Sequence, residues 1–142
     1  RPAEEAGVRA IHLRIGIVLA ARDGALAKLR TPASLCVAGP IGSGRQWMPW
    51  IAMDDVVGLI HDLLMSDSGS GAINAVTGSV RQLDFIRTLG RVLRRPTLLP
   101  MPASAVKLLF GQMGTELLLG GQRVTSERWP TFGALPVFGD LE

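Results

Sequence analysis

The stretch Leu13-Arg-Ile-Gly-Ile-Val-Leu19 decides the fold that we expect for this chain of 142 residues. It belongs to an apolar run, 8–20, that is rich in β-branched residues. A run that is apolar at consecutive positions is typical of a strand buried on both faces of a parallel sheet. We therefore predict a strand over 8–20, whose apolar sequence Arg14 interrupts.

Helical and strand-like patterns alternate after this strand. The expected elements are a helix over 25–36, a strand over 45–53, a helix that begins at Asp54, a strand over 71–76, a helix that Pro96 ends, and further helices over 102–109 and from 116 to 119. Strands that alternate with helices favour an α/β fold with at least one parallel pair. The short opening segment that ends at Gly7 resembles the last turn of a helix, which predicts that a longer protein precedes it.

Two of the expected helices carry local start signals. Asp54 is suited to accept hydrogen bonds from the free amides of its helix, whose predicted core face has helical spacing. That face consists of Val56, Leu59, Ile60, Leu63 and Leu64. Ser79 and Gln82 have the spacing of a capping box, in which two side chains satisfy each other's backbone amides. We therefore expect Ser79 to cap the helix that follows.

Composition limits the classes of function. Hydrophobic residues make up 47% of the chain and charged residues 19%, which is apolar for a small soluble domain. We therefore expect either an adhesive, apolar surface or a surface of which part lies against another protein segment. One cysteine excludes an internal disulfide, and two histidines give no cluster with zinc-ligand spacing, so no metal site is predicted. The cysteine usage favours the cytoplasm, with an organelle interior open if an upstream targeting segment is missing.

Neither a membrane nor a nucleic acid is an expected partner. The apolar region 96–121 is interrupted by Pro100, Pro102, Lys107 and Glu116, so it predicts core helices instead of a membrane span. The net charge is only +3, and acidic residues are interspersed among the basic ones, which argues against binding a polyanion through the arginine-rich helix end at 91–95.

The glycine-rich segment Gly39-Pro-Ile-Gly-Ser-Gly44 predicts a loop. It has the glycine spacing of a phosphate-binding loop, but Arg45 and Gln46 replace the lysine and the hydroxyl that such a loop needs, and a strand follows it instead of a helix. It also lacks the glycine order of a dinucleotide-binding fingerprint. Two interpretations remain: a connector, or a ligand-binding loop in which Arg45 contacts a phosphate.

Arg14 and two tryptophans are candidate ligand residues. A guanidinium inside an apolar strand needs a carboxylate, a carbonyl or a phosphate as partner, so Arg14 either pairs with Asp54 or Asp55 or contacts a ligand. Trp47 and Trp50 are three residues apart on the expected strand, so they face opposite sides. One of them is available to stack on a ligand, whereas the ordinary interpretation of a tryptophan is a core residue.

Several segments together resemble the atypical extended short-chain dehydrogenase/reductases, usually named nucleoside-diphosphate-sugar epimerases or epimerase family proteins. The matching segments occur in family order: Leu13-Arg-Ile-Gly-Ile-Val-Leu19, Asp23-Gly-Ala-Leu26, Gly39-Pro-Ile-Gly-Ser-Gly-Arg-Gln46, Trp50-Ile-Ala-Met-Asp-Asp55, Leu89-Gly-Arg-Val-Leu-Arg-Arg-Pro96, Gly121-Gln-Arg-Val124 and Phe138-Gly-Asp-Leu-Glu142. The resemblance implies an α/β fold that consists of the carboxy-terminal part of a Rossmann-like parallel sheet and a small mixed α/β substrate domain. It implies a late Rossmann strand over 8–20 and a substrate-side subdomain over 21–142.

The resemblance also implies which residues bind ligands. Arg14, Gly16 and Val18 would lie near an NADP or NAD cofactor of the complete protein. The substrate side, which would take a small molecule such as a nucleotide-sugar, would be lined by Gly42, Ser43, Arg45, Trp47 and Trp50. The role of Gln122 and Arg123 stays unassigned.

The chain departs from the family pattern in ways that bear on activity. The family's pyrophosphate loop and its catalytic tyrosine and lysine positions lie upstream of Arg1, and this chain has no tyrosine. Ala52 stands where a histidine is common, and Trp129-Pro130 replaces an expected helical stretch. We therefore expect no catalytic residue here and neither tight cofactor binding nor turnover by the chain alone. The expected partners are the missing amino-terminal half and a second copy in a homo-oligomer; the alternative is a non-enzymatic protein-interaction module.

Overall fold

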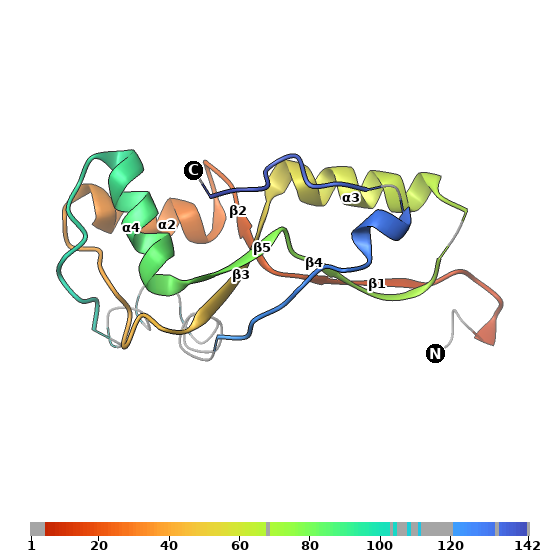
Figure 1. Cartoon of the computed structure of the whole chain (residues 1–142), viewed down its shortest axis with the longest axis horizontal. Coiled ribbons are helices and arrows are strands. Elements are labelled where there is room, and N and C mark those ends of the chain that lie inside the picture. Colours follow the sequence, from red (N-terminus) through yellow and green to blue (C-terminus); the bar gives the residue numbers. More distant parts are fainter. Residues whose placement is uncertain are drawn as a thin grey trace.

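The computed structural model describes residues 5–67, 69–102, 104, 108, 111, 121–132 and 134–141. Its elements are β1 (Ile11–Ile15), β2 (Ile17–Leu19), α2 (Gly24–Ser34), β3 (Trp47–Ala52), α3 (Met53–Met65), β4 (Gly71–Ala75), β5 (Gly78–Arg81), α4 (Gln82–Leu93) and the 3₁₀ helix η2 (Trp129–Phe132). Figure 1 shows an elongated molecule with α3 over β1 and β4 at one end and with α2 and α4 at the other. The expected α/β fold is confirmed.

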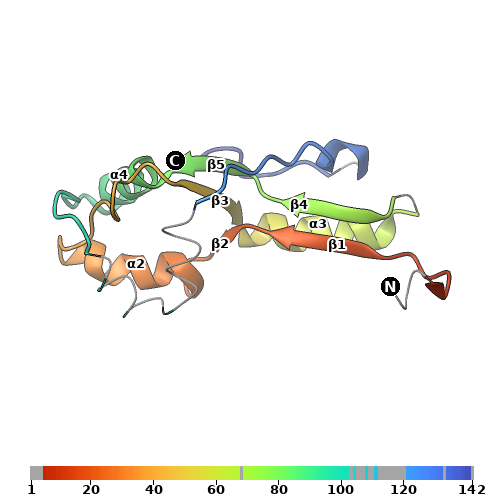
Figure 2. The same ribbon diagram turned by 90° about the horizontal axis from the view of Figure 1, so that it is seen from below.

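Two small sheets carry this arrangement. In the first, β1 and β4 are parallel, with Ile11 opposite Gly71 and Ile15 opposite Ala75. In the second, β3 is central; it pairs in parallel with β2 and in antiparallel fashion with β5. Figure 2 shows the chain passing from β1 into β2, and so from one sheet to the other. The strand predicted over 8–20 is therefore two strands that belong to different sheets.

Gly16 lies at this change of sheet. Its amide donates to the carbonyl oxygen of Ala75 at 3.1 Å. A Cβ atom at this position would lie 2.8 Å from the carbonyl oxygen of Pro49 and 3.1 Å from Cγ2 of Val76. Since side chains are not accommodated at such distances without movement of the backbone, the strands meet closely here because residue 16 is glycine.

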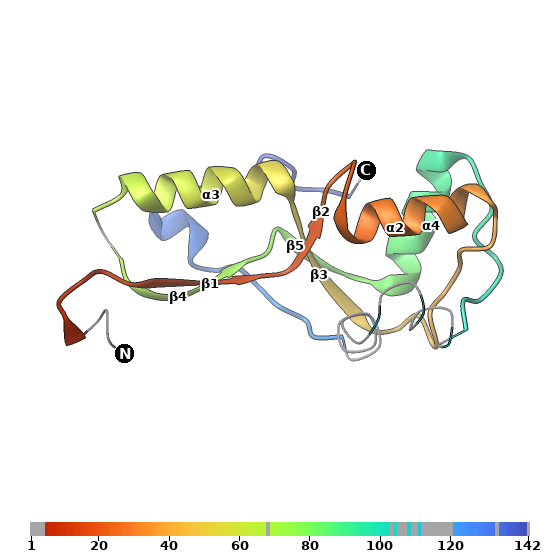
Figure 3. The same cartoon turned by 180° about the vertical axis from the view of Figure 1, so that it is seen from behind.

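The prediction that this strand is buried on both faces is wrong for β1. Arg14 and Ile15 are exposed. Figure 3 shows α3 along one face of the β1–β4 pair, whereas no described helix covers the other face. An apolar strand with one uncovered face fits a sheet that is completed by another protein segment.

Two apolar clusters form the core. One joins α2, α4 and β3 and contains Leu29, Met48 and Ile86. The other packs α3 on both sheets and contains Leu59 and Ile73. On α3, the predicted core face is correct for Val56, Leu59 and Leu63, but Ile60 is 39% exposed and Leu64 is 73% exposed. The face of α3 that contacts the sheets is therefore narrower than predicted, and Ile60 and Leu64 lie outside it.

Both predicted helix caps are wrong. Helix α3 begins at Met53 with Ala52 as N-cap, so Asp54 lies in the first turn and caps nothing. Helix α4 begins at Gln82 with Arg81 as N-cap. Ser79 is a residue of β5, opposite Pro49, so its hydroxyl is too far back in the chain to cap α4. Each local pattern was overridden because the neighbouring strand continues up to the helix.

Two further predictions concern the last third of the chain. The helices expected over 102–109 and 116–119 fall on segments of which only Pro102, Ser104 and Leu108 are described, so they lie outside the description. Trp129, which interrupts the family pattern, is 3% exposed and donates from Nε1 to the carbonyl oxygen of Asn74 at 2.9 Å. It is therefore a core residue. In the described part of the chain, helices are all too short or too polar to cross a membrane.

Candidate functional site

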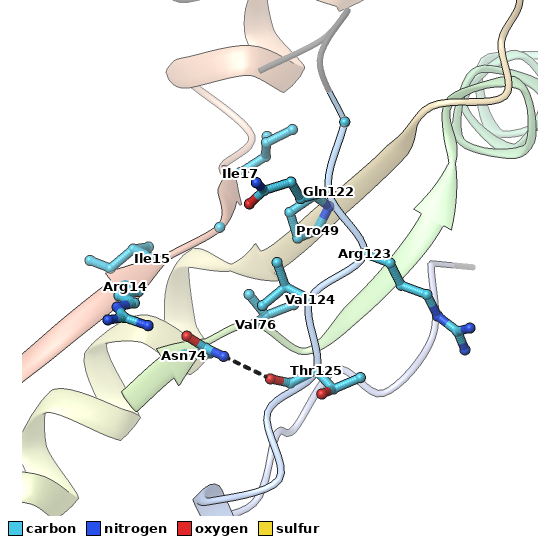
Figure 4. A pocket seen from close by; sticks show the side chains of 12 residues that line it. Arg14, Ile15, Ile17, Pro49, Asn74, Val76, Gln122, Arg123, Val124 and Thr125 are labelled. Carbon is cyan, nitrogen blue, oxygen red and sulfur yellow. Dashed lines mark hydrogen bonds between the residues drawn. The ribbon is translucent and has the colours of Figure 1, made fainter. Parts of the chain in front are cut away.

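A cleft of about 650 Å³ opens at the carboxyl ends of β1 and β4. Twelve residues line it: Arg14, Ile15, Gly16, Ile17, Pro49, Asn74, Val76, Gly121, Gln122, Arg123, Val124 and Thr125. Figure 4 shows that they come from the end of β1, the start of β2, β3, the end of β4 and the extended segment 121–125. In open α/β sheets, ligands bind outside the carboxyl ends of the parallel strands. The cleft has that position, and its volume is within the range of small-molecule sites.

The polar groups of the cleft carry a positive charge and no negative one. Among the described residues, its lining includes Arg14, Arg123 and the side-chain amides of Asn74 and Gln122, but no acidic residue, and the guanidinium of Arg123 lies over the Trp47 ring. Arg14 makes no hydrogen bond or ion pair with any described residue, so the alternative in which it pairs with Asp54 or Asp55 is not observed. A cleft of this kind favours a ligand that presents hydrogen-bond acceptors or negative charge to Arg14.

Segment 121–125, which we call the strap, forms one wall of the cleft. Gly121 lies so close to β3 that a Cβ atom there would be 2.7 Å from the amide nitrogen of Trp47. Farther along, the hydroxyl of Ser79 donates to the carbonyl oxygen of Val124 at 2.7 Å and accepts from its amide at 3.1 Å. Nδ2 of Asn74 donates to the carbonyl oxygen of Thr125 at 3.1 Å. The hydrogen bonds from Ser79 of β5 and Asn74 of β4 therefore fix the strap at the edge of the cleft.

The predicted cofactor residues are only partly gathered here. Arg14 and Gly16 line the cleft. Val18 does not; it packs against the core cluster beneath α3. Because β2 turns into the second sheet after Gly16, alternate positions of the predicted single strand do not share one ligand face.

The two tryptophans lie on opposite faces of β3, as their spacing predicts. Trp47 is half-buried, and the guanidinium groups of Arg81 and Arg123 lie 3.8 and 5.0 Å from its ring centroid. Trp50 is 3% exposed, and a Cβ atom on Gly78 would lie 3.1 Å from its Nε1. Neither tryptophan is among the residues that line the cleft. Their assignment to the substrate side stays a prediction.

The glycine loop lies beside the start of α4 and outside the cleft lining. Gly42, Ser43 and Arg45 are exposed. The loop backbone is held at Ile41, whose amide donates to Oε1 of the buried Gln82 at 3.0 Å and whose carbonyl accepts from Nε2 of Gln46 at 2.8 Å. Such a loop is a fixed connector whose exposed edge is still available to a ligand.

Asn74 and Gln122 are cleft residues that sequence reasoning did not assign. The segment Gly121-Gln-Arg-Val124 was noted as a motif, which was the available signal, but its role depends on contacts with residues more than 40 positions away. Asn74 lies at the end of a strand that carried no motif. A polar residue at the carboxyl end of a predicted parallel strand is the signal that could have identified it.

Comparisons with known proteins agree with this architecture. Residues 101–129 match the model of a domain of unknown function, DUF1731. The epimerase family protein SDR39U1 homolog of Arabidopsis thaliana, described as chloroplastic, is 41% identical over 127 residues, which are 89% of this chain and 36% of that protein. The crystal structure of human epimerase family protein SDR39U1 (isoform 2) with NADPH is 33% identical and has a TM-score of 0.86, over 94% of this chain and 46% of that one.

More distant solved structures share the fold alone. One is the UDP-N-acetylglucosamine 4-epimerase from Methanobrevibacter ruminantium, which is 16% identical with a TM-score of 0.67, over 94% of this chain and 43% of that chain. The α/β arrangement with its parallel pairs matches the carboxy-terminal part of the Rossmann-like fold of short-chain dehydrogenase/reductases. The chain matches the carboxy-terminal part of proteins of the epimerase family. It spans less than half the length of these relatives.

Proposed function

We propose that this chain supplies one wall of the active site in an NAD(P)-dependent epimerase- or reductase-like protein. The observation that carries the proposal is the cleft at the carboxyl ends of β1 and β4, with the guanidinium of Arg14, which pairs with no described residue, at its edge. The complete protein would consist of an amino-terminal cofactor-binding half followed by this chain. In it, the strand region 8–20 would join the cofactor-binding sheet, and 21–142 would form the substrate side.

The residues of the cleft fit the nicotinamide end of a dinucleotide. The human relative, 33% identical, has been solved with NADPH. Gly16 lines the cleft beside Arg14, whose guanidinium can donate to ligand oxygens. We propose Arg14, Gly16 and, less directly, Val18 as cofactor residues. When bound, the cofactor would supply hydride transfer to a carbonyl or sugar-like carbon.

This chain's own residues would bind and orient the reactants. The strap closes one side of the cleft, and the apolar lining, which includes Ile17 and Pro49, excludes water from a bound ring. The substrate, which we propose to be a small molecule such as a nucleotide-sugar, would lie toward Trp47 and Arg45. Since no tyrosine is present, the proton would be transferred by a residue of the other half.

The proposal predicts a specific loss on replacing Arg14 in the complete protein. Arg14→Ala should weaken NADPH binding about 10-fold or more, because a hydrogen bond to a charged group contributes about 1.5–3 kcal/mol. Arg14→Lys should recover only part of the lost affinity, because lysine keeps the positive charge but lacks the planar guanidinium with its paired donors. Fluorescence titration with NADPH measures both effects.

Arg87→Ala is the matched control, since Arg87 is an exposed arginine of α4 outside the cleft lining. It should bind NADPH as the parent protein does. Equal affinities for the Arg14→Ala and Arg87→Ala variants would remove Arg14 from the site.

The outer face of α3 favours a second candidate, the protein-interaction module. Val57 is 60% exposed and Leu64 is 73% exposed, and with Ile60 they form an apolar stripe on the side away from the sheets. In the leading proposal the amino-terminal half covers part of this apolar surface. Light scattering on the complete protein distinguishes the two proposals, because it measures whether copies of the protein associate. Association of the complete protein that Val57→Glu abolishes would favour the interaction module.

A further inference from the structure

The strap directs one unassigned side chain into the cleft. In an extended segment, neighbouring side chains point to opposite sides. Arg123 points toward Trp47, 5.0 Å from the ring centroid. Figure 4 shows Gln122 on the other side of the strap, directed across Pro49 toward Ile17. Its amide makes no hydrogen bond with any described residue.

We propose that the side-chain amide of Gln122 binds the carboxamide of the cofactor's nicotinamide ring, and that Ser79 is the residue that positions it. This inference rests on the proposed function, which puts the nicotinamide beside Arg14 and Gly16. A glutamine amide both donates and accepts, as does the nicotinamide carboxamide, so the two can pair through two hydrogen bonds. The other side-chain amide of the cleft, on Asn74, already donates to the strap at 3.1 Å.

The rest of the lining suits the ring that carries this carboxamide. Five apolar side chains face the same cleft, namely Ile15, Ile17, Pro49, Val76 and Val124. These side chains provide apolar surfaces for a flat aromatic ring. The described lining has no carboxylate, so the neutral amide of Gln122 is the group that we expect to bind the carboxamide on that ring. Gln122 and the Gly16 backbone would then contact the nicotinamide from opposite sides.

Ser79 controls where Gln122 lies because it binds both backbone groups of Val124, two residues farther along the strap. The two hydrogen bonds, of 2.7 and 3.1 Å, fix the strap against β5 in position and in rotation. Without the hydroxyl, the amide and the carbonyl of Val124 lose a partner together. The strap would then no longer hold the Gln122 amide in one place, although the fold, which rests on the two apolar clusters, would remain.

The test compares two cofactors in the complete protein. NADPH carries the carboxamide, whereas its reduced 3-acetylpyridine analogue carries an acetyl group that accepts a hydrogen bond but cannot donate one. The parent protein should bind NADPH about 5- to 10-fold more tightly than the analogue, as expected for one neutral hydrogen bond, and Gln122→Ala should bring that ratio close to one. Arg87→Ala, an exposed change on α4 outside the cleft lining, is the control and should keep the parent ratio.

The same ratio tests the positioning role. Ser79→Ala should reduce the ratio as Gln122→Ala does, and Ser79→Thr, which retains a hydroxyl, should restore it. A general loss of structure would weaken both cofactors equally and leave the ratio unchanged. A parent protein that binds NADPH but has a ratio of one, or a Gln122→Ala variant with the parent ratio, would overturn this inference alone. A parent protein that binds neither cofactor would overturn the proposed function as well.

Discussion

Alanine at position 39 is expected to destabilise the protein by about 3 kcal/mol, the upper end of the usual effect of overpacking. The Cβ atom of Gly39→Ala would lie 1.8 Å from the carbonyl oxygen of Leu99 and 2.6 Å from its carbonyl carbon. These are backbone atoms, so no rotation of a side chain relieves the contact. The adjacent backbone is also fixed, because the amide of Met101 donates to the carbonyl of Pro40 at 3.0 Å. Urea unfolding followed by tryptophan fluorescence measures the change.

Gly58→Ala is the matched control for this substitution. Gly58 lies within α3, and a Cβ atom there would meet nothing within 4 Å. Alanine in a helix interior is favoured over glycine by about 0.5–1 kcal/mol, so this variant should be slightly more stable than the parent. If both alanines had the same effect on the urea midpoint, the close packing of the loop on the 97–101 segment would be contradicted.

Removing the carboxylate of Asp55 is expected to cost about 3 kcal/mol, because it would leave three part-buried donors without an acceptor. Asp55 is 4% exposed. It accepts hydrogen bonds from the amide of Val137 at 2.8 Å, from that of Phe138 at 3.4 Å and from the hydroxyl of Thr77 at 3.2 Å. It thereby joins α3 and the β4–β5 connection to the carboxy-terminal segment.

Asp54→Ala serves as the comparison, since Asp54 is exposed in the same helical turn and caps nothing. Its free energy of unfolding should stay within about 0.5 kcal/mol of the parent. Asp55→Ala should also speed amide hydrogen exchange at Val137 and Phe138. Exchange at these two amides that is as slow in Asp55→Ala as in the parent would show that the carboxylate does not hold this segment.

The sequence predicted those elements whose pattern is local. Helix α3 was predicted from apolar spacing, and strand β4 from a short apolar run, and both occur close to the expected bounds. The split of the first strand was not predictable in this way, because it depends on which strand pairs with which. Ile15 faces Ala75 of one sheet, whereas Ile17 faces Trp50 of another.

The site hypothesis began from a residue that conflicted with its surroundings in the sequence. Arg14 was identified because a charge in an apolar strand needs a partner, and the structure places it at the edge of the cleft. Ser79 and Gln82 misled because their spacing satisfied a local rule while their partners are distant. Ser79 bonds Val124, 45 positions away, and Gln82 bonds Ile41, 41 positions away. Gln122 lies in the recognised segment Gly121-Gln-Arg-Val124, but its role could not be assigned, since it depends on the strap that those distant contacts hold.

The most direct test of the central claim is the affinity for NADPH of this chain alone and of the complete protein, measured by the same fluorescence titration. In the proposed function this chain supplies one wall of the active site and the amino-terminal half supplies the pyrophosphate loop. The chain alone should therefore bind NADPH with a Kd weaker than about 1 mM, a binding free energy of about 4 kcal/mol. The complete protein should bind NADPH with a Kd in the micromolar range, a binding free energy of about 8 kcal/mol. Micromolar binding by the chain alone, or none by the complete protein, would contradict the account.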